Sequence, residues 1–158
     1  MLRPTHVWLL GVGLALALSS RAPSAAEDDT LLVIVNPGVT AGGLSGDNLG
    51  AIYTMARRGW PGGLNVIPYN YDPSNKLRIR FDQVVLGMSP DQAARFWVDH
   101  RIRGAGSAPR KVPSVALMVR VVSQLAGAIG YVPAGTPTAG TKVVARISNN
   151  RVQPVNER

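Results

Sequence analysis

A strand that runs directly into a capped helix, within residues 60–81, constrains this chain more than any other feature. The apolar run at residues 64–69 predicts a short buried strand. Asp72-Pro73-Ser74 then predicts a helix start, with Asp72 as the N-cap and Pro73 in the first turn. A helix N-terminus beside a strand end presents unpaired N–H groups and a positive dipole end, which is the general geometry of an anion site. This junction is therefore the first candidate for function.

The first 26 residues have the pattern of a secretory signal peptide. Arg3 and His6 give a weakly basic start, residues 7–18 are an unbroken apolar or glycine run, and Ser24-Ala25-Ala26 has the small-residue pattern of a cleavage site. The apolar run is well short of the roughly 20 residues that a spanning helix needs. The sequence has no cysteine, which excludes a lipoprotein anchor and disulfides. We therefore expect export to the periplasm.

The mature chain, residues 27–158, is long enough for one domain with a single core. Removal of Arg3 and Arg21 with the signal peptide lowers the formal net charge from +8 to about +6. Such a balance favours anionic partners such as phosphate-like solutes, lipid headgroups or polyanions, although surface charge for solubility accounts for it equally well. Export, and the lack of aromatic residues interleaved with the basic ones, argue against a nucleic-acid partner.

Hydrophobic periodicity predicts a three-layer α/β domain over residues 27–147, in which helices flank a mixed sheet. The last residues, 148–158, are polar and predict a disordered tail. The clearest local signal is a capping box, with Ser89 at the N-cap, Pro90 at the first helical position and Gln92 three residues after the cap. The expected strands are residues 30–35, 64–69, 127–133 and 141–148, and the expected helices are residues 46–58, 73–86, 90–100 and 115–125.

Catalysis and metal binding find little support in the residues. His100 is the only histidine after the signal peptide, and it follows Asp99 directly, so the two side chains would point about 100° apart on a helix. One histidine with scattered aspartates makes no metal cluster. The glycine-rich segment at residues 104–111 lacks the spacing of a phosphate-binding loop and does not follow a strand. We therefore expect a protein that is not an enzyme and has no cofactor.

Several motifs in this order resemble the phosphate-binding proteins that serve bacterial ABC transporters, in a short form with a single lobe. The resemblance spans residues 31–133. It begins with a strand that ends in Asn36-Pro37 and a helix, and it continues with two arginines before a Trp-Pro-x-Gly turn at Trp60. It then runs through Val66-Ile-Pro, a helix that ends at Phe81, Phe96-Trp97 and Gly127-Ala-Ile-Gly-Tyr-Val132. The resemblance implies one lobe of the type 2 periplasmic binding fold.

The family's phosphate ligands are an Arg, an Asp and a Ser-Gly-Thr that follow the central strand. This sequence departs from that pattern at each of these positions. Tyr71 stands in place of the Arg and Pro73 in place of the Asp, and Asn75, Lys76 and Leu77 occupy the Ser-Gly-Thr. The family's selective site is therefore not carried over. What remains is a set of donors and cations that predicts an altered anion site: Ser74, Asn75, Lys76, Arg78 and Arg80.

Two hypotheses follow for the function. The first is an extracytoplasmic module that binds a small oxyanion such as phosphate, linked to ABC-type uptake or sensing. Full enclosure of phosphate needs donors from two sides, so tight capture would require a homodimer or another protein as the second jaw. The second is an accessory protein of the cell envelope that kept the fold, lost the ligands and binds a permease or another envelope protein. Its candidate partner surface is basic, with a solvated hinge as the alternative interpretation: Arg101, Arg103, Arg110 and Lys111.

Overall fold

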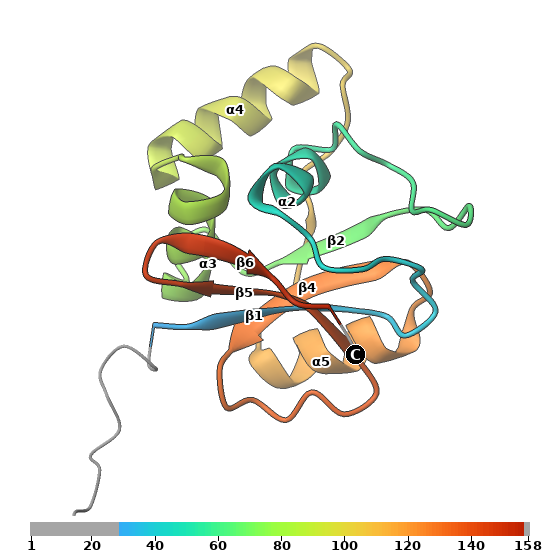
Figure 1. Ribbon diagram of the computed structural model, residues 1–158. Coiled ribbons are helices and arrows are strands. Elements are labelled where there is room, and N and C mark those ends of the chain that lie inside the picture. The colour runs from blue at the N-terminus through green and yellow to red at the C-terminus, as the bar shows by residue number, and fades with distance from the viewer. Residues whose placement is uncertain (1–28, 157–158) are drawn as a thin grey trace, which may run out of the picture.

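The computed structural model describes residues 29–156, so the predicted signal peptide and the last two residues lie outside the described part. Figure 1 shows a sheet with helices on both faces. The strands are β1 (Leu31–Val35), β2 (Ile67–Asn70), β3 (Arg110–Lys111), β4 (Ala128–Pro133), β5 (Lys142–Ser148) and β6 (Arg151–Pro154). The helices are α2 (Gly46–Tyr53), α3 (Lys76–Phe81), the π-helical η1 (Asp82–Leu86), α4 (Pro90–Ile102) and α5 (Val115–Gln124). Within residues 29–156, no helix is long and apolar enough to cross a membrane.

The six strands form one mixed sheet in the order β3-β2-β4-β1-β5-β6. β1 lies in the middle and is antiparallel to both β4 and β5, whereas β2 is parallel to β4 and to β3. β2, β3 and β4 therefore all run in the same direction, and their carboxyl ends lie at the same end of the sheet. The prediction of a mixed sheet flanked by helices is confirmed.

Two successive residues of the buried strand β4, Gly130 and Tyr131, pack against the helical layers on opposite faces of the sheet. Tyr131 faces the layer of α2 and α3, where its ring lies 6.1 Å from that of Tyr53 and 4.1 Å from that of Phe81. Gly130 faces α5, and a methyl group added to it would lie 2.3 Å from the sulfur of Met118. Since neighbouring side chains of a strand point to opposite faces, this pair of residues fixes the three-layer arrangement.

The Trp60 turn is fastened to the start of β4 through one carbonyl. The Gly127 oxygen accepts hydrogen bonds from the indole N–H of Trp60 at 2.9 Å and from the backbone N–H of Ile67 at 3.0 Å. Gly127 has φ +82°, and a methyl group added to it would lie 2.0 Å from the backbone oxygen of Asn65. Only glycine combines this conformation with so close an approach.

Three predicted helix starts are confirmed by their caps. Ser45 accepts a hydrogen bond from the N–H of Asn48, and Ser114 caps α5 in the same way. Ser89 and Gln92 make both bonds of the predicted capping box. These side chains satisfy backbone donors that the first turn of a helix leaves without partners.

The predicted end of the first helix is wrong, because α2 ends at Tyr53 and not near residue 58. The hydroxyl of Thr54 donates to the Gly50 carbonyl at 2.7 Å and so competes for an acceptor of the helix. Met55 then adopts φ +62°, a left-handed conformation that stops the helix.

The predicted disordered tail at residues 148–158 is wrong for its central part. Residues 151–154 form β6, which pairs antiparallel with β5 across a turn at Asn149 and Asn150, both with positive φ. Two Asn residues in this conformation form the two-residue hairpin turn that matches strand twist. The segment between the helices expected at residues 90–100 and 115–125 also holds more regular structure than expected, because α4 extends to Ile102 and residues 110–111 form β3.

The close approach at Gly127 gives a first testable prediction. Gly127→Ala should lower the free energy of unfolding by at least about 2 kcal/mol, because a Cβ would strain the positive φ and collide with backbone. Gly59→Ala is the matched control, because nothing lies within 4 Å of the added methyl group at that position. Urea denaturation of both variants measures the difference, and equal stabilities would contradict this account of the turn.

Candidate functional site

The junction between β2 and α3 is built differently from the sequence prediction. The predicted helix start at Asp72 and Pro73 is wrong: α3 begins at Lys76, and its N-cap is Asn75, whose side chain accepts a hydrogen bond from the N–H of Leu77 at 2.9 Å. Asp72 and Asn75 each offer a side-chain oxygen to a helix start, and the structure uses that of Asn75. The predicted single helix to residue 86 is also divided, since η1 follows α3 directly.

Asp72 instead folds the turn that precedes the helix. Its Oδ1 accepts from the backbone N–H of Ser74 at 3.2 Å and from the Ser74 hydroxyl at 3.0 Å. Its Oδ2 forms an exposed ion pair with Lys111 Nζ at 3.3 Å. The hydrogen bonds from Ser74, and then the contact with Lys111, lower the pKa of the Asp72 carboxyl. A carboxylate that is ionised at neutral pH therefore stands among the predicted anion ligands, where it repels an anion.

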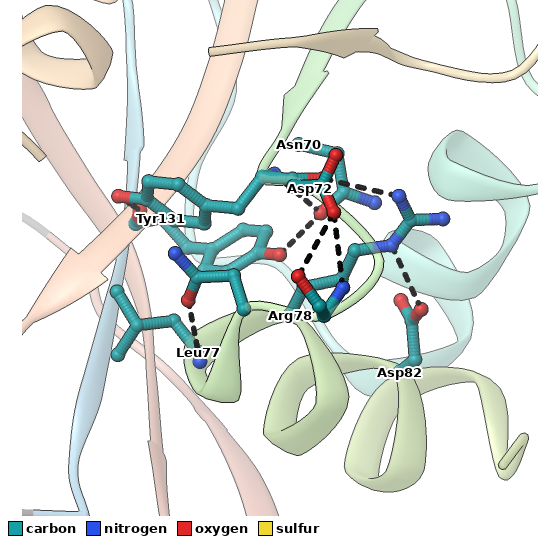
Figure 2. Close-up of polar contacts among 9 residues, drawn as sticks. Asn70, Asp72, Leu77, Arg78, Asp82 and Tyr131 are labelled. Atoms are coloured by element: carbon teal, nitrogen blue, oxygen red, sulfur yellow. Dashed lines mark hydrogen bonds and ion pairs between the residues drawn. The ribbon is translucent and has the colours of Figure 1, made fainter. Parts of the chain in front are cut away.

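Arg78 is turned into the protein. Its Nε donates to Asp82 Oδ2 at 3.2 Å and its Nη1 donates to the Tyr71 carbonyl at 3.0 Å (Figure 2). Arg78 is 7% exposed and Asp82 is 4% exposed, so both charges are largely removed from water. Burial raises the pKa of Asp82, and the Arg78 cation opposes that rise. Arg78 thus links the end of β2 to the start of η1.

The remaining predicted ligands lie apart from one another. Ser74 and Lys76 are exposed on the turn and on the first residue of α3. Arg80 points toward the β5–β6 turn, where its Nη1 donates to Asn150 Oδ1. The Arg80 Nε is buried without a hydrogen-bond partner among the described residues. The junction therefore brings Ser74, Asn75 and Lys76 together and holds Arg78 and Arg80 elsewhere.

Beneath the junction lies a network of tyrosine hydroxyls that sequence reasoning missed. Tyr131 donates to Asn70 Oδ1, which also accepts from the Tyr71 N–H at 2.9 Å (Figure 2). The Tyr71 hydroxyl donates to the Tyr131 carbonyl at 2.9 Å. Burial raises the pKa of both hydroxyls, so they stay protonated and act as donors. No sequence signal indicated Asn70 or Tyr131, whereas Asp82 stands four residues after Arg78, the spacing of a helical ion pair.

The four residues of the predicted basic surface are all exposed, and they come from two places, the end of α4 and the strand β3. Arg101 lies in the last turn of α4, and Arg103 follows that helix. Arg110 and Lys111 are successive residues of β3, so their side chains leave opposite faces of the sheet. Lys111 is the one that reaches Asp72. This edge strand therefore divides the predicted surface between two sites.

A further arginine joins the loop that precedes β3. Arg58 Nη2 donates to the carbonyl of Ala105 at 2.6 Å, and its Nε donates to the carbonyl of Met55 at 3.3 Å. Sequence reasoning used Arg58 only as part of a motif and did not assign it to the basic surface. The contact could not be predicted, because the two partners are 47 residues apart in the sequence.

His100 lies in the last turn of α4, where its ring stacks on that of Phe96 at 4.6 Å and lies at the edge of Trp97. Asp99 is exposed, and no contact between the two side chains places them as a catalytic pair. Among residues 29–156, no group of three His, Cys, Asp or Glu side chains could hold a metal ion.

Comparison with solved structures places the fold. An ABC-type phosphate transport receptor from Vibrio cholerae matches with a TM-score of 0.57 and 16% identity, over 72% of this chain and 44% of the receptor. PstS from Borrelia burgdorferi matches with a TM-score of 0.53 and 19% identity, over 67% of this chain and 41% of PstS. No protein-family model and no curated protein sequence matches.

The resemblance to phosphate receptors is thus confirmed at the level of the fold. The chain spans less than half the length of either receptor, which agrees with the prediction of one lobe. The neighbour from Vibrio cholerae is a phosphate transport receptor.

The buried Arg78–Asp82 pair gives a second prediction. Arg78→Met should lower the free energy of unfolding by about 3 kcal/mol, because it leaves a buried carboxylate without its cation. Arg78→Met combined with Asp82→Leu should recover part of this loss, since no buried charge then remains. Chemical denaturation of the original protein, of the single variants Arg78→Met and Asp82→Leu, and of the double variant tests the coupling, and strict additivity of the two single changes would contradict it.

The loss of stability in Arg78→Met should also depend on pH. Without Arg78, burial acts unopposed, so the folded-state pKa of Asp82 rises further above its unfolded value. The folded state then binds this proton more tightly than the unfolded chain, so stability increases as the pH falls through the folded-state pKa. The deficit of Arg78→Met relative to the original protein should therefore shrink as the pH falls from neutral toward the ordinary pKa of a carboxyl group. A constant deficit would show that the Asp82 charge is not the cause.

Proposed function

We propose that this chain is an extracytoplasmic binding lobe of the phosphate-receptor type that docks with another envelope protein and does not enclose phosphate. The observation that carries the proposal is the engagement of Arg78. The one predicted cation beside the helix start that is buried donates to Asp82 and to the Tyr71 carbonyl, and so is committed to the protein itself.

The backbone at the junction supports the same conclusion. The N–H of Ser74 is taken by Asp72, the N–H of Asn75 by the Asp72 carbonyl, and the N–H of Leu77 by Asn75. An oxyanion would have to displace these internal acceptors, and it would meet the Asp72 carboxylate while doing so. Desolvation of an oxyanion costs too much unless its oxygens are matched by donors, so tight capture is disfavoured here.

The basic surface supports a docking role. Arg101, Arg103 and Arg110 are exposed, and no acidic partner is recorded for their side chains in the described part of the chain. Exposed cations steer association with acidic surfaces and add to the rate of encounter. The partner is then a permease, another envelope protein or a second copy of this chain.

A second candidate is an open oxyanion site, and the exposure of Ser74 and Lys76 at the strand–helix junction favours it. The Ser74 hydroxyl, the Lys76 ammonium group and the first free N–H of α3 would be its donors. Such a site would bind weakly and lose affinity as salt is added.

Site-specific crosslinking in the producing cells tests the docking proposal. Arg103 is replaced by the photo-crosslinking amino acid p-benzoylphenylalanine, and Gln153, on the edge strand at the opposite side of the sheet, serves as the matched control. We expect one discrete crosslinked species from position 103 and none from position 153. A species of twice the chain mass would identify a second copy as the partner. Equal or absent crosslinking at both positions would overturn the proposal.

Thermal-shift titration separates the two candidates. Phosphate, sulfate and chloride at matched ionic strength should raise the melting temperature equally if docking is the function. A saturable, phosphate-selective rise would support the open site, since a ligand at 100 times its dissociation constant stabilises by about 2.7 kcal/mol. Lys76→Glu should then abolish the rise, whereas Arg101→Glu, an equal change of charge at the end of α4, should preserve it.

A further inference from the structure

A pocket of about 280 Å³ lies at the start of β2. It is remote from the junction between β2 and α3, here called the anion junction because the sequence predicted an anion site there. Its lining combines Met55, the first residues of the β2 segment at 66–68, and residues 107–110, which lead into β3. Most of this lining is apolar, with the Ser107 hydroxyl and the Arg110 side chain as its polar members. None of the lining residues is acidic.

The pocket follows from the way in which the edge strand is paired. β3 pairs with β2 only at Tyr69–Arg110 and Asn70–Lys111. The preceding segment, 107–109, lies across the pocket from residues 66–68 without a strand pairing to them. Met55, which adopts the left-handed conformation that stops α2, also lines the pocket. The result is a wedge-shaped pocket between residues 66–68 and residues 107–110, here called the wedge.

Two arginines give this wedge a positive rim. Arg110 lines it directly. Arg58 donates to the carbonyl of Met55, a lining residue, and to the carbonyl of Ala105, two residues before the lining segment 107–110. Both residues are exposed, and each guanidinium has five N–H donors, so donors remain for carboxylates of a ligand.

The outer side of β3 adds a backbone element to the site. β3 is the last strand of the sheet, and no described strand pairs with its free side. An extended peptide can add to such an edge through main-chain hydrogen bonds while its side chains enter neighbouring pockets. Arg110 and Lys111 on this edge oppose pairing with a basic chain, including a second copy of this one, and favour an acidic one.

We propose that the wedge between residues 66–68 and 107–110 binds an extended acidic peptide segment of a partner protein, with one bulky apolar side chain in the pocket and its carboxylates on Arg58 and Arg110. A pocket of about 280 Å³ has room for one bulky apolar side chain. This inference rests on the proposed docking function and specifies the chemistry of the partner.

Methyl NMR of the purified protein labelled at the methionine methyl groups tests it. Met55 lines the pocket, while Met118, which is fully buried beneath β4, reports whether the fold is intact. The probes are three blocked pentapeptides: EDFDE, its alanine form EDADE and its basic form KKFKK. We expect EDFDE to shift the Met55 signal saturably and Met118 not at all. EDADE should bind at least about tenfold more weakly, and KKFKK should give no shift.

Two charge reversals complete the experiment. Arg110→Glu should weaken EDFDE binding by about tenfold or more, whereas Arg151→Glu, an equal change of charge at an exposed residue of β6 on the opposite edge of the sheet, should leave it unchanged. Equal binding of all three peptides, or no effect of Arg110→Glu in a protein with an unchanged Met118 signal, would overturn the inference. Octanoate that competes as tightly as EDFDE would overturn the peptide assignment in favour of a small amphiphile.

The failure of this inference can be told apart from failure of the proposed function. A crosslinked partner from position 103 together with no EDFDE binding would leave docking in place and reject the wedge as its site. Selective EDFDE binding without any crosslinked partner in cells would leave the wedge as a peptide-binding site and reject the proposed docking at the basic surface.

Discussion

The Arg78 guanidinium decides what the junction of β2 and α3 can do. It holds the Tyr71 carbonyl at the end of the strand and the Asp82 carboxylate at the start of η1. A buried cation is tolerated only when its donors and its charge are matched, so this arginine is retained by its internal partners. The same matching removes it from any ligand. The internal hydrogen bonds that stabilise the junction and the binding of an anion would both need the Arg78 donors, and in this structure the internal bonds use them.

The architecture could be predicted because its signals are local. Hydrophobic periodicity indicated β1, α2, β4 and α5, and each cap needed only a side chain three residues before its donor. The errors arose where local signals competed. Asp72 and Asn75 both offer an oxygen to a helix start, and the preference of Asp72 for the Ser74 N–H decided between them. β3 and β6 were missed because their short polar segments become strands only through pairing with a neighbour.

The candidate site was less predictable than the fold, because its partners are distant in the sequence. The types and exposure of Ser74 and Lys76 could be anticipated, but the direction of Arg80 depends on Asn150, 70 residues away. Lys111 was assigned to a partner surface and instead reaches Asp72, 39 residues before it. The charge of a side chain can be read from the sequence, whereas the acceptor that it finds is set by the sheet order. Only the Arg78–Asp82 pair, one helical turn apart, carried its own signal.

The two strands at this side of the sheet keep the anion junction and the wedge separate. Ile67 lines the pocket, and Asn70, three residues later, supports the junction. In β3 the division falls between neighbours, with Arg110 at the pocket and Lys111 at Asp72. Because opposite ends and faces of the same strands form the two sites, the loss of one set of ligands leaves the other geometry intact. A lobe of this fold can therefore commit its donors internally at the junction and keep a basic pocket at the other end of β2, because the two places draw on different residues.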